Sequence, residues 1–331
     1  MTAIIDIETD SEIVFEANLK FFGGLDCDSG EVTIFDYTER TKIRNYLKHH
    51  KVLVGYNIKN FDIPILQNYG IKLYGHQIVD LWEALAPIGD QTFGTYNKNR
   101  LHDINPGLIL KNYKLKTIIS ALKLDKQNKG DIDYNIFKKN SWTIEEKNKI
   151  EEYLTQDLVI EYKLFDWYVN TFKPLEQYIK EEDVENYKHL TCASGSLAYK
   201  VMCYLTENEE DYENWAISRE IKRTAPRIEG GHHIHARWEK VRGKIICKDF
   251  TSHYPTILLM YNLLTTEQGK ALHKLLIERI TAKQKGDKAK ATALKVPINS
   301  IYGLLGNPTF INIYNPIAAN DCTKYGRELL K

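Results

Sequence analysis

The segment Ala-Ile-Ile-Asp-Ile-Glu-Thr at residues 3–9 decides the fold of the first half of this chain. Its apolar, β-branched residues predict a short buried strand over residues 3–7. Because side chains two positions apart on a strand point to one face, Asp6 and Glu8 should present their carboxylates together. Two such charges repel each other unless a cation lies between them, and hard oxygen ligands suit Mg²⁺ or Mn²⁺. The alternative interpretation of an isolated Asp-x-Glu pair is a solvated strand edge.

The flanking sequence predicts that this strand belongs to an α/β domain. Residues 51–55 form a second short apolar run that is typical of a buried strand. Residues 115–124 and 145–169 have the apolar spacing of helices. Alternation of this kind predicts a sheet covered by helices. Pro174 would end the domain, because a proline terminates the helix before it.

The composition is that of a folded globular protein. The chain has 331 residues, 43% of them hydrophobic, with 45 Lys and Arg against 44 Asp and Glu. At roughly 150 residues per domain, this length predicts about two domains. The composition excludes collagen-like, mucin-like and disulfide-scaffold proteins. The balanced charge gives no global sign of a nucleic-acid partner, so such a partner must be argued from local sites.

The sequence predicts a cytoplasmic protein with no membrane partner. Its five cysteines are scattered without zinc-binding spacing, which is typical of free thiols in a reducing compartment. The N-terminus reaches an acid at Asp6 without a basic segment, which excludes a signal peptide. The longest apolar stretch, residues 254–264, is broken by Pro255 and Asn262 and is too short to cross a bilayer.

Two more motifs in the first domain carry acidic side chains. The second predicted strand is followed by Asn57-x-x-x-Phe61-Asp62, which places Asp62 near the start of a helix. Tyr153 and Asp157 are four residues apart on the predicted helix 145–169, so both side chains address one site. Taken singly, the first motif is also consistent with a helix-capping aspartate and the second with a surface contact.

The three motifs in this order resemble those of proofreading 3′→5′ exonucleases of the DEDDy type. The resemblance implies a ribonuclease-H-like domain in which two Mg²⁺ or Mn²⁺ ions activate a water and stabilise the leaving 3′ oxygen. It further implies that Tyr153 orients the attacking water. The metal ligands that it implies are Asp6, Glu8, Asp62 and Asp157.

The same resemblance implies contacts to the single-stranded 3′ end of DNA. Thr9, Asn57 and Phe61 occupy the matching positions, where a hydroxyl and an amide form hydrogen bonds and a phenyl ring stacks on a base. The segment Lys-Gly-Asp-Ile-Asp-Tyr at residues 129–134 resembles the exonuclease of small protein-primed phage polymerases. It implies that Lys129 assists catalysis by offsetting negative charge at the phosphate. The alternative is an exposed lysine before a turn.

The second half of the chain resembles the polymerase part of family B DNA polymerases. An apolar run ends at Asp249 and continues as Phe-Thr-Ser-His-Tyr-Pro-Thr, which resembles motif A. This implies that Asp249 binds both catalytic metals and that Tyr254 closes the pocket below the sugar. Residues 295–303, Lys-Val-Pro-Ile-Asn-Ser-Ile-Tyr-Gly, resemble motif B. Pro297 departs from that pattern and would remove a helical hydrogen bond.

Further residues are implied to contact the nucleotide and the template. Arg279 and Lys283 share a face of a predicted helix, beside a buried stripe that ends at Ile280. The resemblance implies that they bind the triphosphate, and the alternative is that both are solvated bases on the surface of the helix. Ile-Glu-Gly-Gly at 228–231 resembles a template-contacting element, so Gly230 and Gly231 let the backbone approach phosphate. The implied nucleotide-binding residues are Tyr254, Arg279, Lys283, Lys295, Asn299 and Tyr302.

Together the resemblances predict a domain order. We expect the exonuclease domain at 1–173, a connecting segment at 174–226, and a partial palm at 227–331 with two short fingers helices at about 266–305. The third polymerase motif, Asp-Thr-Asp, does not follow Tyr302. We therefore expect the N-terminal part of a polymerase, with that motif and the thumb carried by a second polypeptide or missing from a truncated chain.

The expected function is DNA-directed DNA synthesis with 3′→5′ proofreading, on primer–template DNA and dNTPs. One alternative is a stand-alone DNA 3′→5′ exonuclease whose second half is only a platform for DNA. Another is a non-catalytic, DNA-binding assembly subunit. The four exonuclease acids argue against the subunit, and the nucleotide-binding side chains argue against the platform.

Overall fold

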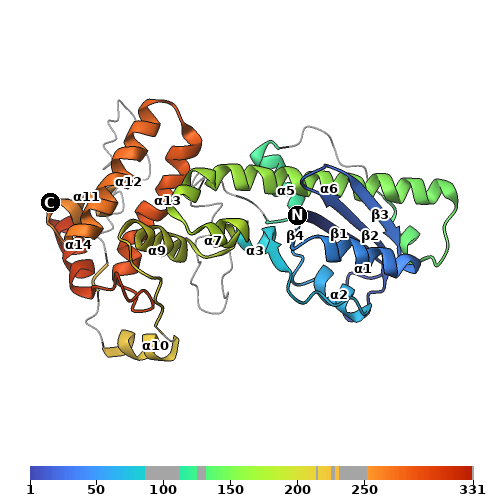
Figure 1. The fold of residues 1–331 in the computed structure, drawn as a ribbon, viewed down its shortest axis with the longest axis horizontal. Helices are drawn as coiled ribbons and strands as arrows, with labels where there is room; N and C mark the ends of the chain where they lie inside the picture. Colours follow the sequence, from blue (N-terminus) through green and yellow to red (C-terminus); the bar gives the residue numbers. More distant parts are fainter. Residues whose placement is uncertain are drawn as a thin grey trace, which may run out of the picture. The chain divides into compact units, whose positions relative to one another are not determined.

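The computed structural model describes residues 1–85, 104, 110, 112–124, 132–213, 215–224, 228–230 and 252–329. Lys129, Gly231 and Asp249, three of the predicted site residues, lie outside this part of the chain. The chain divides into two compact units (Figure 1). The first comprises Met1–Asn170 and Glu182–Thr191, and the second Thr171–Glu181 and Cys192–Lys331.

The first unit is built on one mixed five-stranded sheet with the order β3-β2-β1-β4-β5. The strands are β1 (Thr2–Thr9), β2 (Leu19–Asp26), β3 (Val32–Asp36), β4 (Val52–Gly55) and β5 (Gln77–Asp80). Strands β1, β2 and β3 pair antiparallel, whereas β1 pairs with β4, and β4 with β5, in parallel. The predicted strands at 3–7 and 51–55 are therefore confirmed, and the first lies at the centre of the sheet.

Helices lie on both faces of this sheet (Figure 1). The helices of this unit are η1 (Tyr37–Glu39), α1 (Arg40–His49), α2 (Asp62–Asn68), α3 (Leu81–Leu85), α5 (Leu115–Leu122), η2 (Tyr134–Lys138), α6 (Ile144–Phe172), α7 (Glu181–Glu185) and α8 (Lys188–Thr191). The helices predicted at 115–124 and 145–169 correspond to α5 and α6.

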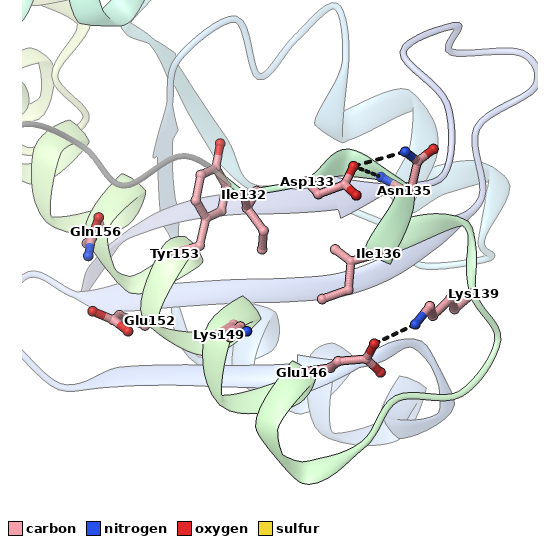
Figure 2. A pocket seen from close by; sticks show the side chains of 10 residues that line it. All are labelled: Ile132, Asp133, Asn135, Ile136, Lys139, Glu146, Lys149, Glu152, Tyr153 and Gln156. Atoms are coloured by element: carbon pink, nitrogen blue, oxygen red, sulfur yellow. Dashed lines mark hydrogen bonds and ion pairs between the residues drawn. The ribbon is translucent and has the colours of Figure 1, made fainter.

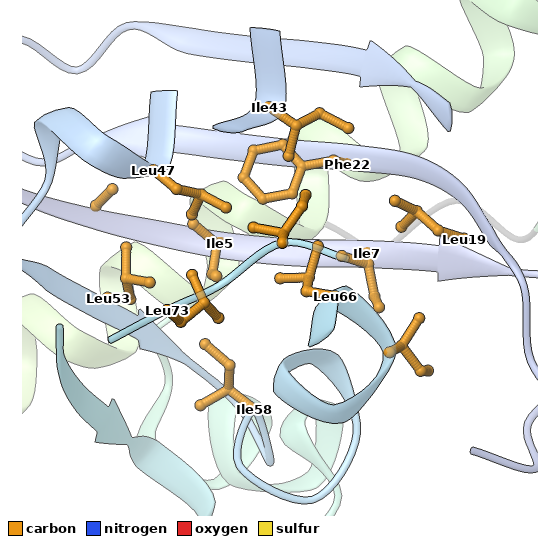
Figure 3. Close-up of a cluster of buried hydrophobic side chains, with 13 residues drawn as sticks. Ile5, Ile7, Leu19, Phe22, Ile43, Leu47, Leu53, Ile58, Leu66 and Leu73 are labelled. Carbon is orange, nitrogen blue, oxygen red and sulfur yellow. The ribbon is translucent and has the colours of Figure 1, made fainter. Parts of the chain in front are cut away.

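The alternation of β1 separates its apolar side chains from its acids. Ile5 and Ile7 point into a core formed with Phe22 of β2, Ile43 of α1 and Leu66 of α2 (Figure 3). This core buries apolar area on one face, which is the main source of stability for a sheet of this kind. Asp6 and Glu8 consequently face the opposite side, where α6 packs.

A glycine in β2 lets α6 approach that second face closely. A Cβ atom on Gly23 would lie 2.8 Å from Cγ of Leu154 and 2.9 Å from Cδ1 of Leu158, both on α6. Gly23 is also the register partner of Asp6 on β1. Because no side chain separates the sheet from the helix here, α6 runs beside the strand that carries Asp6.

A hydrogen-bonded His–Asp contact joins β2 to the end of α1, and it should make stability depend on pH. Nε2 of His50 lies 2.8 Å from Oδ2 of Asp26, and Nδ1 lies 2.9 Å from the carbonyl oxygen of Tyr46. The hydrogen bond with His50 is the main reason that the pKa of Asp26 falls to about 2. A lowered carboxyl pKa stabilises the fold above the unfolded-state pKa, and this stability is lost as pH falls through the folded value.

We therefore expect the free energy of unfolding to decrease between about pH 4 and pH 2, with Asp26 contributing about 1 kcal/mol after solvent screening. Denaturant unfolding across this pH range should show a shallower decline for Asp26→Asn than for the wild type. Asp28→Asn, on the same turn, is the matched control. Parallel curves for the wild type and Asp26→Asn would show that the pair does not contribute.

The second unit is helical in its described part. Its helices are η3 (Lys173–Tyr178), α9 (Ser194–Leu205), α10 (Trp215–Thr224), α11 (His253–Met260), α12 (Thr266–Gln284), α13 (Lys288–Leu305) and α14 (Pro316–Leu329). Helix α13 packs against α9, α11, α12, α14 and η3, so it forms the centre of the unit. Residues of the expected connecting segment form η3 and α7–α10 and are divided between the two units.

Two long helices lie where the fingers helices were expected. Helix α12 begins at a capping box of Thr265 and Gln268, and α13 begins after the N-capping side chain of Asp287. Helix α13 continues through Pro297, which is buried. The prediction of a buried Ile280 is wrong: its side chain is 38% exposed, because the described part of the unit does not cover that side of α12.

No helix in the described ranges is both long enough and apolar enough to cross a membrane.

Candidate active site

The acidic face of β1 opens into a pocket of about 560 Å³. Its lining comes from β1 and the loop after it, the turn between β4 and α2, and helices α2, α5, η2 and α6. The pocket therefore gathers segments that are far apart in the sequence. The predicted exonuclease residues in its lining are Asp6, Glu8, Thr9, Asn57, Phe61, Asp62, Tyr153 and Asp157.

Three carboxylates converge in this pocket. Asp6 and Glu8 of β1 and Asp157 of α6 each offer an oxygen atom, and these atoms all lie within 4.8 Å of one another. Glu8 and Asp157 are buried, whereas Asp6 is partly exposed to the pocket. Like charges at this separation and burial are costly unless protons or cations offset them. The group has the hard oxygen atoms that Mg²⁺ and Mn²⁺ prefer.

Asp62 supplies a fourth carboxylate to the pocket, outside this tight group. It is the first residue of α2 and is only 5% exposed. Burial raises the pKa of Asp62 well above its usual range, and the charge of Asp6 raises it further. Oδ1 of Asp62 is buried without a hydrogen bond from the described part of the chain. Such an atom is costly to bury unless a proton or a cation satisfies it, so the residues present fit a divalent cation.

Tyr153 lies one helical turn before Asp157, beside the carboxylates. Its side chain is buried, and its hydroxyl is 3.3 Å from the hydroxyl of Tyr134 in η2. Burial is the main cause that raises the pKa of Tyr153, and the charges of Asp157 and Glu8 add to it. The side chain therefore stays a neutral phenol at physiological pH and can donate a hydrogen bond into the pocket.

Tyr153 also borders a second pocket of about 560 Å³ on the other side of η2 (Figure 2). This pocket lies between η2 and the first turns of α6, and its rim carries both charge signs (Figure 2). Lys139 and Glu146 form an ion pair there, and Asp133 accepts hydrogen bonds from Asn135. The ion pair joins the end of η2 to the first turn of α6, and the Asp133 bonds cap η2.

The segment between β4 and α2 brings Asn57 and Phe61 to the pocket. Asn57 has a φ of 63°, a left-handed conformation that asparagine tolerates better than most residues. Its carbonyl oxygen accepts the backbone N–H groups of Asn60 and Phe61 at 3.1 and 3.2 Å. Thr9, at the end of β1, also lines the pocket and donates its hydroxyl to the carbonyl oxygen of Ser11 at 2.8 Å.

The lining residues that were not predicted from the sequence include Tyr56, Tyr134, Lys138 and Glu161. Glu161 is buried and follows Asp157 by four residues, so the helical spacing that links Tyr153 to Asp157 would also have found it. Lys138 is the one basic side chain in the described lining. No sequence signal distinguishes it from Lys139, because both lie at the end of η2.

Replacement of Tyr153 by phenylalanine should slow the reaction of this site without weakening the fold. The change removes one hydroxyl at a position where the ring remains packed on α6. If Tyr153 holds the attacking water, kcat for removal of a 3′ nucleotide should fall by about 10²-fold with little change in KM. Tyr134→Phe, which removes only the partner hydroxyl, is the matched control. Equal kcat values for wild type and Tyr153→Phe would contradict the role.

The second unit brings several of the predicted nucleotide-binding residues together. The rings of Tyr254 on α11 and Tyr302 on α13 stack with centroids 4.6 Å apart and planes at 27°. Arg279 on α12 donates from Nη1 to Oγ of Ser252 at 2.6 Å, next to the start of α11. Burial lowers the pKa of Arg279 from its usual value.

The remaining predicted residues of this unit lie on the surfaces of the same helices. Lys283 is exposed on the last turn of α12, and Asn299 is exposed on α13. Lys295, one turn before Asn299, is partly buried. Gly230 accepts a hydrogen bond at its carbonyl oxygen from Arg327 of α14 at 2.9 Å.

Comparisons with known proteins match this chain by structure and not by sequence. No protein-family model and no curated protein matches it. Its structure is similar to that of the family B DNA polymerase from the hyperthermophilic archaeon Pyrobaculum calidifontis, with a TM-score of 0.62 and 15% sequence identity. The match covers 99% of this chain and 50% of the polymerase chain. The chain therefore has a family B DNA polymerase-like fold and spans about half the length of that polymerase.

Proposed function

We propose that this chain is a 3′→5′ exonuclease that removes nucleotides from the 3′ end of DNA, within the N-terminal part of a family B DNA polymerase. The observation that carries the proposal is the convergence of Asp6, Glu8 and Asp157 within 4.8 Å beside the buried Asp62. The sheet order and the mixture of antiparallel and parallel pairs support a ribonuclease-H-like domain. The polymerase-like fold supports DNA as the substrate.

The four carboxylates would hold two Mg²⁺ or Mn²⁺ ions. Such ions lower the pKa of a bound water and offset the negative charge that develops on the phosphate and on the leaving 3′ oxygen. The buried Oδ1 of Asp62 and the tight group of Asp6, Glu8 and Asp157 supply the oxygen atoms. The charge of these acids explains why DNA phosphate would not enter the pocket without cations.

Other side chains of the pocket would hold the substrate. The phenyl ring of Phe61 offers a stacking surface to the terminal base, and the amide of Asn57 offers hydrogen bonds. Tyr153 would hold the attacking water through its neutral hydroxyl. Lys138 lies in the lining of the same pocket. Its ammonium group would offset negative charge at the cleaved phosphate, which is the role that the resemblance implies for Lys129.

The second unit would bind primer–template DNA and the incoming dNTP. The stacked rings of Tyr254 and Tyr302 would form a surface for the sugar and the nascent base pair. Arg279 is hydrogen-bonded to Ser252, the residue that precedes the helix of Tyr254. Lys283, Lys295 and Asn299 would contact the nucleotide along the same two helices. Asp249 would bind the polymerase metals, and the backbone at Gly230 and Gly231 would approach the template phosphate.

A 5′-labelled primer–template incubated with Mg²⁺ tests the proposal. Without dNTPs we expect a ladder of products shortened one nucleotide at a time from the 3′ end. The same assay with dNTPs measures primer extension and so tests the second unit. Absence of shortening with both Mg²⁺ and Mn²⁺ would contradict the exonuclease.

A further inference from the structure

A buried carboxylate at the edge of the sheet makes more backbone hydrogen bonds than its place in the sequence suggests. Asp80 is the last residue of β5, pairs in register with Gly55 of β4, and is only 1% exposed. Oδ1 accepts the backbone N–H groups of Asn57, Trp82 and Glu83 at 3.1, 2.9 and 3.1 Å. Oδ2 accepts the N–H of Lys59 at 3.0 Å.

These bonds divide into two sets with different consequences. Trp82 and Glu83 belong to the first turn of α3, so Asp80 caps that helix in the ordinary way. Asn57 and Lys59 belong to the turn after β4, which precedes the site residues Phe61 and Asp62. A helix cap needs only the first set, so the second set requires its own explanation.

The second set connects Asp80 to the pocket through a continuous series of hydrogen bonds. Asp80 accepts the amide of Asn57, whose backbone is left-handed. The carbonyl of Asn57 then accepts the amides of Asn60 and Phe61. Asp62 is held separately, because it is the buried first residue of α2. Loss of the Asp80 contacts would therefore displace Asn57 and Phe61 more than Asp62.

We propose that Asp80 is a positioning residue that fixes Asn57 and Phe61 for binding of the single-stranded 3′ end. This inference rests on the proposed exonuclease function, and it assigns to Asp80 an effect on substrate affinity and not on the chemical step. The buried carboxylate of Asp80 holds the turn after β4 in place. This turn positions the side chains of Asn57 and Phe61, which would contact DNA.

Two substitutions separate this role from helix capping. In Asp80→Asn the amide oxygen can still accept the three hydrogen bonds of Oδ1. Its NH₂ group, however, faces the N–H of Lys59, and because both groups are donors this hydrogen bond is lost. In Asp80→Ser the hydroxyl can still cap α3, whereas the bonds to Asn57 and Lys59 are lost. At saturating Mg²⁺ Asp80→Ser should raise KM for a single-stranded oligonucleotide by about tenfold, and Asp80→Asn, which keeps the bond to Asn57, should raise it less; kcat should change less than about threefold in both.

Glu83→Gln is the matched control. Glu83 forms an ion pair with Lys59 at the surface, so it joins the same two segments without touching the buried bonds. We expect its KM to stay within about twofold of wild type. If Asp80→Ser behaves like wild type, Asp80 is only a cap; if kcat falls and KM does not, Asp80 acts on the reacting groups. Either outcome overturns the inference.

Hydrogen exchange of backbone amides tests the positioning independently of activity. The amide of Lys59 should exchange faster in both Asp80 variants and that of Asn57 in Asp80→Ser, whereas amides in β1 should keep the wild-type rate. Unchanged exchange at Asn57 and Lys59 would overturn the inference whether or not the enzyme degrades DNA. An inactive wild type with accelerated exchange in the variants would instead contradict the proposed function and leave the structural role of Asp80 in place.

Discussion

The double variant Asp6→Ala/Glu8→Ala is expected to lose about 10⁴-fold or more of its 3′→5′ exonuclease rate, equivalent to about 5.4 kcal/mol of transition-state stabilisation. Both side chains come from the central strand β1 and contribute two of the three converging carboxylates. Their removal leaves only Asp157 and Asp62 to hold cations beside the 3′ end. The measurement is the rate of shortening of a 5′-labelled single strand at saturating Mg²⁺.

Folding and DNA binding should survive this change. Removal of two neighbouring negative charges relieves their repulsion of Asp157, so the melting temperature without metal should stay equal or rise. Glu12→Ala, which removes an exposed acid from the lining of the same pocket, is the control and should keep the wild-type rate. A double variant that keeps more than about 1% of the wild-type rate would contradict the assignment of these acids.

Removal of divalent cations should have an effect of similar size. In excess chelator we expect the rate of shortening to fall to background, and added Mg²⁺ or Mn²⁺ should restore it. The same ions should raise the melting temperature of the wild type, because they bind the folded carboxylate group and not the unfolded chain.

The thermal shift provides the control for this second prediction. Mn²⁺ should stabilise Glu12→Ala as much as wild type and should not stabilise Asp6→Ala/Glu8→Ala. Equal shifts in all three proteins would place the ions elsewhere, and shortening that persists in excess chelator would contradict a metal-dependent reaction.

The sequence predicted the central strand, and the shared face of Asp6 and Glu8, for a simple physical reason. Apolar alternation in β1 is local information, and it determines that Asp6 and Glu8 share a face. The i and i+4 spacing of Tyr153 and Asp157 is likewise local. That these segments meet in one pocket could only be inferred from the order of the motifs, because no local pattern contains a distance between β1 and α6.

Strand β2 shows why other parts of the fold were not predicted. Gly23 and Gly24 are poor strand formers, and a glycine pair in isolation indicates a turn. In the structure, side chains of α6 and of α1 occupy the space beside these glycines, so tertiary packing overrides local propensity. The same packing gives α6 its close approach to the strand of Asp6.

Contacts between distant residues explain the remaining omissions. No local pattern marks Asp80 as a positioning residue, because its partners Asn57 and Lys59 lie more than twenty residues earlier in the chain. Ile280 was placed in a buried stripe by its spacing, but spacing does not show where the covering element ends. Both cases depend on which segments the fold brings together.

Crystals soaked with Mn²⁺ and a non-cleavable single-stranded oligonucleotide would test the central claim most directly. Anomalous scattering should show two Mn²⁺ ions in the pocket of Asp6, Glu8, Asp62 and Asp157, with the 3′ terminus beside them. Manganese bound only away from these four carboxylates, or a 3′ terminus in another part of the molecule, would contradict the account.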